Sequence, residues 1–367
     1  MYAVKHDFFF KICTLWHHPE FTVRESLSLE VSPYLRKTAA SSEAPLLLLQ
    51  ERSGLSPWLF GTLCGVALFA FMFSPALIVD LGDSERRDLL GGALFFGSSF
   101  GIVAGCLGPV LRGAVRDLER LRGVLPLSDS DFALARKCLT RTTPGTVLAM
   151  LLTGLLLGIA HNYLLSHFSL PVPFVVTQCT GTVLLWIIMN QAMPKLIINA
   201  LLFSRLGASA NPDLLRPSKH SAFGDAAIRP GILVIGVIVA YGFLIMGEDN
   251  PFDDAVWIGI AASLLSLVGI VALPLRGIRR RIRETRTAAL QQLDARYDAI
   301  SRDGLTSAEP QQLSAMDTLL DMRERVAQAP GWPMDLAGVR RILLYVVLPP
   351  LTWAAAALVE MLIDSAV

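Results

Sequence analysis

Charged residues are scarce in this chain. Asp, Glu, Lys and Arg make up 17% of its 367 residues, whereas a water-soluble domain carries about 25%. The formal net charge is only +1, so no general electrostatic attraction to nucleic acid is expected. Hydrophobic residues make up 53% of the chain. This composition is typical of a membrane protein, provided that the apolar residues gather into spans.

Catalytic and metal-binding motifs are also missing from the sequence. It contains no nucleotide-binding, zinc-protease, nucleophile-elbow, CxxC or kinase pattern. No nucleophile–base pair or acid–base pair is visible. Cys13, His17 and His18 are grouped near the N-terminus, but a zinc site normally has four ligands. We therefore expect a protein that is not an enzyme and that uses no cofactor and no metal.

Long uncharged runs are what the sequence has instead. A bilayer core is crossed by about 20 apolar residues of helix, and the 142–194 run is long enough for two such spans, which Pro171 and Pro173 would separate as a hairpin. The sequence thus predicts an all-α fold, a polytopic transmembrane helical bundle of about seven spans. The predicted spans are 57–79, 89–111, two within 142–194, 231–247, 255–275 and 342–359.

Basic residues are distributed very unequally between the two sides of these spans. With the N-terminus inside, 30 of the 32 Lys and Arg residues fall in four inner segments. Enrichment of Lys and Arg on the cytoplasmic side is the usual rule for membrane proteins, so we expect a multi-pass protein of the inner (plasma) membrane with its N-terminus inside. The inner segments are 1–56, 112–143, 195–230 and 276–341.

A run of arginines follows the sixth predicted span. Basic runs can mark nucleic-acid sites, but this one comes directly after the apolar stretch 255–275. We interpret it as an anchor at the inner membrane surface, where each side chain gains about 1 kcal/mol beside anionic lipid headgroups. No nucleic-acid partner is expected. The anchor residues are Arg276, Arg279, Arg280, Arg281 and Arg283.

The largest cytoplasmic segment is predicted to form a helical hairpin. Apolar residues follow helical spacing from Ile282 to Ile300, and Thr306 with Glu309 forms a capping box for a second helix. That second helix places Leu313, Met316 and Leu320 on one broad apolar face. Two such helices joined by a short loop pack as an antiparallel pair. The alternative is a plain loop between spans.

The remaining segments complete the expected domain organisation. Residues 1–56 are predicted to be a polar cytoplasmic tail, and 57–275 to hold transmembrane helices 1–6. The segment 112–143 should continue the second span as a short basic helix and then contain a second helix capped by Ser128 or Ser130, and 195–230 should be of mixed structure with a turn at 209–213. The hairpin segment 276–341 is followed by transmembrane helix 7 within 342–364.

Polar side chains recur at one depth in the third and fourth spans. His161 and Asn162 lie about 6–9 Å from the outer end of one, and Gln178 and Thr180 lie at a similar depth in the next. Polar groups inside a membrane are usually paired and face the bundle. Two interpretations remain open for this intramembrane polar cluster. One is a hydrogen bond that ties the two helices together, and the other is a ligand or ion site.

Four sequence stretches resemble a known family. They are "LRGVLPLSDSDFALARKCLT" (121–140), "ALPLRG" (272–277), "WP" (332–333) and "LPPLTW" (348–353). In these the chain resembles an uncharacterised family of prokaryotic multi-pass membrane proteins. The family has no assigned activity, so the resemblance implies a bacterial inner-membrane location and carries over no functional residue.

Two functions remain after these exclusions. The first is a non-enzymatic signalling or scaffolding protein that binds a protein partner or a second copy through the hairpin 276–331. The second is a channel or carrier for a small solute, which would use the polar cluster near His161. Ion-coupled carriers usually keep a charged residue at the bilayer midplane, and none of the predicted spans has one. The first function is therefore favoured.

Overall fold

The computed structural model describes residues 42–43, 45–164, 172–245, 254–302 and 310–332, together with Arg340 and Leu344. The described residues all belong to the second of two units, Thr38–Val367. Three predictions lie outside the described residues: the tail up to residue 41, the capping box at 306–309 and the seventh span at 342–359.

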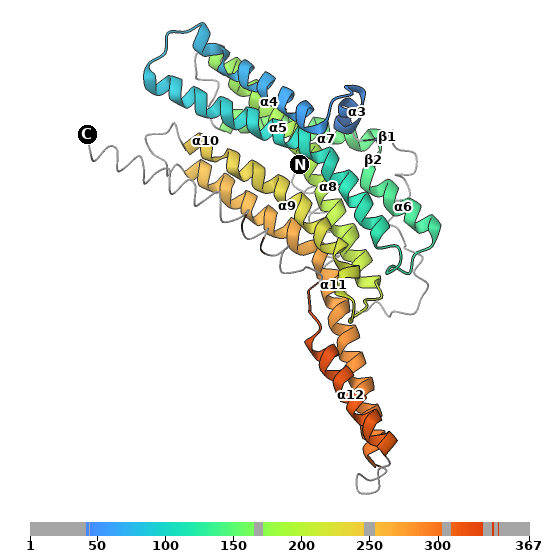
Figure 1. Cartoon of the computed structure of the whole chain (residues 1–367). Helices are drawn as coiled ribbons and strands as arrows, with labels where there is room; N and C mark the ends of the chain where they lie inside the picture. The colour runs from blue at the N-terminus through green and yellow to red at the C-terminus, as the bar shows by residue number, and fades with distance from the viewer. Residues whose placement is uncertain are drawn as a thin grey trace, which may run out of the picture. The chain divides into compact units, whose positions relative to one another are not determined.

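The described part of the chain is built from helices (Figure 1). Its strands are two residues each, and β1 (Ser42–Glu43) pairs antiparallel with β2 (Arg141–Thr142). The helices are α3 (Pro45–Arg52), α4 (Pro57–Phe73), η2 (Ser74–Leu77), α5 (Asp83–Arg120), α6 (Asp129–Thr140), α7 (Pro144–Leu164), α8 (Val172–Ser209), η4 (Pro217–His220), α9 (Ala222–Ala240), α10 (Gly242–Ile245), α11 (Asp254–Arg302) and α12 (Pro310–Gln328).

Six helical segments within the described ranges are long and apolar enough to cross a membrane. The predicted all-α polytopic bundle is therefore confirmed. Apart from the seventh span, which lies outside the described residues, each predicted span corresponds to one of these segments. They are Pro57–Leu77, Glu85–Arg120, Pro144–Leu164, Val172–Ser209, Ala222–Leu244 and Ala261–Ser301.

Several helices continue well beyond the apolar runs that predicted them. α5 extends to Arg120, α8 passes through Pro194 to Ser209, and α9 begins at Ala222. Much of the predicted loops 112–143 and 195–230 is consequently helical. The turn expected at 209–213 is where α8 ends, and Ser128 is the N-cap of α6, with its side chain accepting a hydrogen bond from the Asp131 N–H.

The helix extensions persist because they bury a hydrophobic core of their own. Leu118 of α5, Phe203 of α8, Phe223 of α9 and Ile278 of α11 are fully buried in one cluster, together with Phe132 of α6. Burying a large apolar side chain contributes about 1.5–3 kcal/mol. An apolar-run criterion ends each helix at its first charges, whereas packing holds these helices together for several more turns.

Glycines allow α4 and α5 to touch along their backbones. A Cβ added to Gly61 would lie 2.6 Å from the Gly101 carbonyl oxygen, and one added to Gly65 would lie 2.8 Å from the Gly97 oxygen. Gly154 of α7 meets the backbone of Ile187 on α8 in the same way, at 2.7 Å. Gly97, Gly101 and Gly105 recur every fourth residue on α5, and Gly154 and Gly158 repeat this spacing on α7. Such spacing is typical of seams where membrane helices pack closely, and these contacts form such seams.

The end of α11 continues past the bundle, and α12 folds back along it (Figure 1). Arg279 of α11 lies 4.2 Å from the Trp332 ring centre, and farther along Arg323 Nε lies 2.7 Å from Asp294 Oδ1. These contacts run in opposite directions along the two chain segments, so the pair is antiparallel, as expected for the hairpin. We call α11 from Arg276 onward, together with α12, the arm.

Candidate functional site

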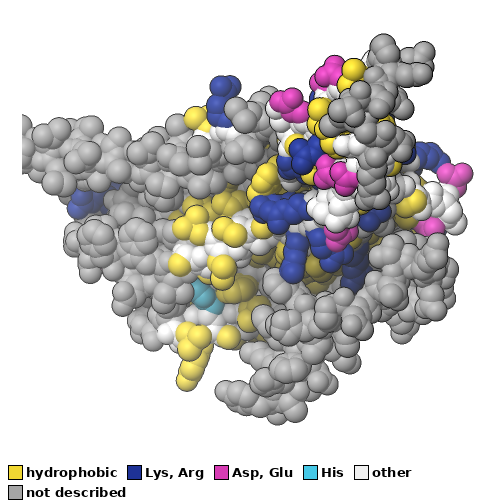
Figure 2. Space-filling view, turned by 90° about the horizontal axis from the view of Figure 1, so that it is seen from below, with side chains coloured by type: hydrophobic (Ala, Val, Ile, Leu, Met, Phe, Trp, Pro, Cys, Tyr) yellow, Lys and Arg dark blue, Asp and Glu magenta, His cyan; other side chains and the backbone are white. Residues whose placement is uncertain are grey.

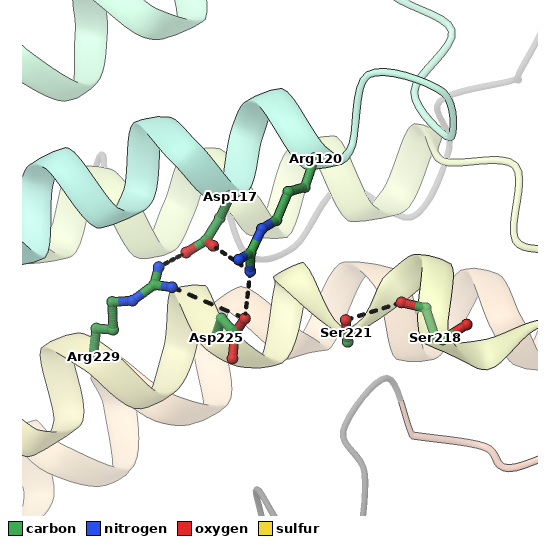
Figure 3. A network of polar contacts seen from close by, with 6 residues as sticks. All are labelled: Asp117, Arg120, Ser218, Ser221, Asp225 and Arg229. Carbon is green, nitrogen blue, oxygen red and sulfur yellow. Dashed lines mark hydrogen bonds and ion pairs between the residues drawn. The ribbon is translucent and has the colours of Figure 1, made fainter.

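A buried carboxylate lies where the helices leave their apolar runs. The side chain of Asp117 on α5 is 0% exposed, and the guanidinium of Arg229 on α9 donates to it (Figure 3). Gly113 of α5 makes room for this arginine, because a Cβ there would lie 2.8 Å from Arg229 Cδ. The sequence thus brings together two charged residues that are 112 positions apart.

Two further residues extend this pair toward solvent. Arg120 Nη1 lies 3.0 Å from Asp225 Oδ2 and 3.7 Å from Asp117 Oδ1. Arg229 Nη2 lies 3.9 Å from the same Asp225 oxygen. We call these four residues the Asp117 network; it holds two cations and two anions and is neutral overall. Only its Asp117 end is fully buried, since 61% of the Arg120 side chain and 40% of the Asp225 side chain are exposed.

The Asp117 network acts as a clamp between α5 and α9. A buried charge is costly unless it is paired and hydrogen-bonded, so the network is stable only when both helices are in register. The sequence interpretation misses this network because it places Asp117 on a short basic helix and Arg229 in a segment of mixed structure, with nothing to indicate that the two segments are neighbours. The available signal was the four-residue spacing of Asp225 and Arg229, which places an acid and a base on the same face of a helix.

A second set of buried polar groups lies on α8. Lys195 is 3% exposed and its Nζ donates to the carbonyl oxygen of Arg141. Asn199, one turn farther on, is 1% exposed, and neither of its side-chain amide atoms has a hydrogen-bond partner among the described residues. The predicted spans were taken to lack charge throughout. As helices they are longer, and α8 carries this lysine inside the bundle.

The predicted polar cluster of the third and fourth spans is only partly gathered. Asn162 is buried, and its Nδ2 donates to the Cys179 carbonyl oxygen at 3.3 Å and to the Gly158 oxygen at 2.9 Å. The hydrogen bond from Asn162 to the neighbouring helix is thus made to the backbone of Cys179, which lies between the predicted partners Gln178 and Thr180. The His161 and Trp186 ring centres are 6.1 Å apart.

The two predicted partners on α8 point in different directions. Gln178 Nε2 lies 3.6 Å from the position that a Cβ on Gly92 of α5 would occupy, so this side chain is directed toward α5. Thr180 is exposed on the outside of the bundle, which is a correction to the expectation that it faces inward. Gln178 and Thr180 are two residues apart, which is a rotation of about 200° around the helix axis. Their side chains therefore point to opposite sides of α8, and the predicted polar cluster does not include both.

The predicted arginine anchor lies along α11 at the base of the arm. Figure 2, which views the molecule from below, shows Lys and Arg side chains gathered beside the projecting arm. Arg281 Nε donates to the Ala210 carbonyl oxygen at 3.2 Å, and Arg280 pairs with Glu284 at 3.4 Å. Arg279 stacks on Trp332. Among the anchor residues, Arg276, Arg280 and Arg283 are exposed, and contact of the cluster with lipid headgroups stays a prediction.

These arrangements contain ion pairs and hydrogen bonds that join helices. In the part of the chain that the structure describes, no three His, Cys, Asp or Glu residues come together in a group that could hold a metal ion. No protein-family model, no curated protein and no solved structure matches the chain.

Proposed function

We propose that this chain is a non-enzymatic, multi-pass protein of the bacterial inner membrane that acts in signalling or scaffolding. Its working part is the arm, which docks a helix of a protein partner or of a second copy of the chain. The bundle fixes the base of the arm in the membrane, and the Asp117 network and the α5, α8, α9 and α11 core hold that base rigid.

The observation that carries this proposal is the exposure of Leu313 and Leu320 on α12, at 50% and 48%. They are seven residues apart and therefore lie on one stripe of the helix, the spacing that coiled-coil pairing uses. Met316 and Val326 are buried instead, on the side of α12 that packs against α11; each is 7% exposed. The hairpin therefore packs without using the Leu313–Leu320 stripe.

Lipid does not account for this exposure. Leu320 lies beyond the Arg323–Asp294 contact toward the tip of the arm. Asp294 is about 30 Å past Leu275 at 1.5 Å per residue, and Leu275 is the last residue of the apolar stretch. Exposed leucines on α4 and α7 belong to helices that can cross a membrane, whereas these two are far from such a region. Leu313 and Leu320 are therefore better explained as a contact surface for another protein or for a second copy of the chain.

Orientation is a separate part of the proposal and has its own test. A reporter that is active only in the cytoplasm should be active when fused after Arg286, and silent when inserted after Gly82, in the segment between α4 and α5. The Lys and Arg distribution supports this orientation. The reverse pattern of activity would place the arm outside and remove the inner-membrane signalling role.

Crosslinking in intact membranes tests the docking surface. A photoreactive amino acid at Leu320 should give one discrete adduct, whereas the same group at Thr318, which is exposed on another side of α12, should not. Leu313→Ser in the same chain should abolish the adduct, because it removes the other half of the stripe. An adduct of twice the chain mass identifies a second copy, and another discrete mass identifies a partner. Equal, diffuse labelling from both positions would exclude a docking surface here.

A carrier is the second candidate, because Lys195 and Asn199 place buried polar groups one turn apart inside the bundle. Asn199 lacks hydrogen-bond partners among the described residues, and such a group is costly unless water or a solute satisfies it. Solute flux into proteoliposomes that is lost in Asn199→Leu, but retained in Leu320→Ser, would favour the carrier over the arm.

A further inference from the structure

A cleft of about 600 Å³ opens between α3, α5 and α6. Its apolar side is formed by Leu47, Leu111, Val115 and Phe132. Its polar side is dominated by cations, contributed by α5, by α6 and by the residue that follows α6. The four cations considered below are Arg112, Arg136, Lys137 and Arg141.

The cleft has more positive charge than its own carboxylates neutralise. Arg122 also lines it, but this arginine pairs with Asp129 and lies over the Phe132 ring. Among the described side chains, the other four cations form no ion pair with a carboxylate. Two further acids, Glu51 and Glu119, line the cleft. Four unpaired cations therefore face two carboxylates around one cavity, which favours an anionic ligand.

Three boundaries between apolar and polar sequence mark the level of the cleft along the bundle. The apolar run of α5 ends at Leu111 and is followed directly by Arg112, and α7 begins at Pro144, just after Arg141. α3 ends at Arg52, and α4 begins at Pro57. All three boundaries mark the passage from apolar helix to polar chain. With the apolar runs in the bilayer core, the cleft is expected at the level of the lipid phosphate groups, at the arginine-rich end of the bundle.

The side-chain amide of Gln50, which is buried beside the cleft, lacks hydrogen-bond partners among the described residues. Gln50 lies on α3 between the cleft residues Leu47 and Glu51 and is 3% exposed. Neither of its amide atoms has a hydrogen-bond partner among the described residues. Gln50 Oε1 and Arg112 Nη2 are both among the atoms nearest to the Cβ position of Gly108. A buried polar group of this kind is usually satisfied by water or by a bound molecule, and this one lies next to Arg112 beside the cleft without lining it.

We propose that this cleft binds the phosphate group of an anionic phospholipid. Arg112 from α5 and Arg136 from α6 hold the phosphate from two walls, and Leu47, Val115 and Phe132 contact the glycerol and the first acyl carbons. Basic pockets between transmembrane helices on the cytoplasmic side are a known mode of headgroup recognition. This site is separate from the arginine anchor on α11, and it does not depend on the function proposed for the arm.

Binding is measured on the purified full chain in a neutral detergent, by native mass spectrometry with graded phosphatidylglycerol or phosphatidylcholine. The wild-type protein should retain phosphatidylglycerol at least tenfold more strongly than phosphatidylcholine. Each of Arg112→Gln and Arg136→Gln should weaken retention about fivefold, the value of one cation near a lipid surface. The matched control, Arg296→Gln, removes the same single charge at an exposed position on the arm, outside the arginine anchor, and should change retention less than twofold.

Four outcomes are possible, and each decides the question. Selective retention that the cleft variants alone reduce supports the lipid site. Inorganic phosphate or glycerol phosphate at millimolar concentration can be added as a competitor. If it displaces the lipid, and the displacement depends on Arg112 and Arg136, the anion site stands but its ligand is a soluble phosphate compound. No preference of the wild-type protein for phosphatidylglycerol overturns the proposal, whether or not the variants fold. Equal losses in cleft and control variants overturn it too, because they indicate unspecific surface charge.

Discussion

Arg229 of α9 donates to the fully buried carboxylate of Asp117 on α5, across 112 residues of sequence. This is the contact by which two helices that are distant in the chain fix their register. Around it, the apolar side chains of α5, α6, α8, α9 and α11 form a core outside the apolar spans. The base of the arm is part of this core, since Ile278 and Ile282 of α11 are buried in it.

Arg229→Met should destabilise the protein by about 3–5 kcal/mol, because it leaves a buried carboxylate without its main partner. The double variant Asp117→Leu with Arg229→Met should recover most of that loss, since it removes both charges. Arg120→Met is the matched control; its side chain is 61% exposed, so less than about 1 kcal/mol is expected. Thermal unfolding in detergent measures all three. A double variant as unstable as Arg229→Met would show that the loss comes from packing rather than charge.

The glycine seam between α4 and α5 gives a second prediction. Gly65→Ala places a methyl group 2.8 Å from the Gly97 carbonyl oxygen, and backbone cannot move aside as a side chain can. We expect a loss of about 1–3 kcal/mol from overpacking, measured as a lower unfolding temperature. Gly269→Ala on α11 is the control, because a Cβ there meets nothing within 4 Å. Equal stability of the two variants would mean that α4 and α5 are farther apart than the seam requires.

The sequence predicts those features that depend on long uncharged runs. The helical class and the division of 142–194 into two spans follow from length and from the Pro171 and Pro173 pair, because a bilayer needs about 20 apolar residues for each crossing. The seam through Gly97 and Gly101 follows from spacing. These features need no knowledge of which helices are neighbours.

Contacts between distant segments were not predictable in the same way. Asp117 lies past the first charges after its span, on the predicted short basic helix, but nothing in the sequence indicates that Arg229 of α9 lies beside it. The arm shows the same limit. Leu313, Met316 and Leu320 were expected on one broad packed face, but α12 turns Met316 toward α11 and leaves the two leucines exposed. Spacing defines an apolar stripe without saying which part is covered.

His220 makes the turn between α8 and α9 sensitive to acid. The backbone N–H of Asp213 donates to His220 Nε2 at 2.8 Å, so this nitrogen must be unprotonated. Burial lowers the pKa of His220 below its ordinary value of 6.5. The unfolded chain therefore binds a proton more readily than the folded one, and stability present above pH 6.5 should be lost as the pH falls toward the folded pKa.

Unfolding temperatures measured from pH 8 to pH 5 test this assignment. The wild-type protein should lose more stability over this interval than His220→Gln, which cannot titrate. Asp213 is the charged group beside the ring, and its hydrogen bond from Lys219 lowers its pKa from 3.8, so it titrates below the tested interval. Parallel curves for the wild-type protein and His220→Gln would mean that another group causes the acid sensitivity.

The two apolar faces of α12 should separate folding of the arm from docking. Met316→Asp with Val326→Asp should detach α12 from α11, because both side chains are 7% exposed and burial of each is worth about 1.5–3 kcal/mol. Leu313→Asp with Leu320→Asp should leave α12 packed, because these side chains are half exposed. Hydrogen exchange of the α12 amides in the full chain measures the difference. Fast exchange is expected for the first pair and protection close to that of the wild-type protein for the second. If the Leu313 and Leu320 variant exchanges as fast as the Met316 and Val326 variant, the leucines support the hairpin itself, and the exposed stripe no longer argues for a partner.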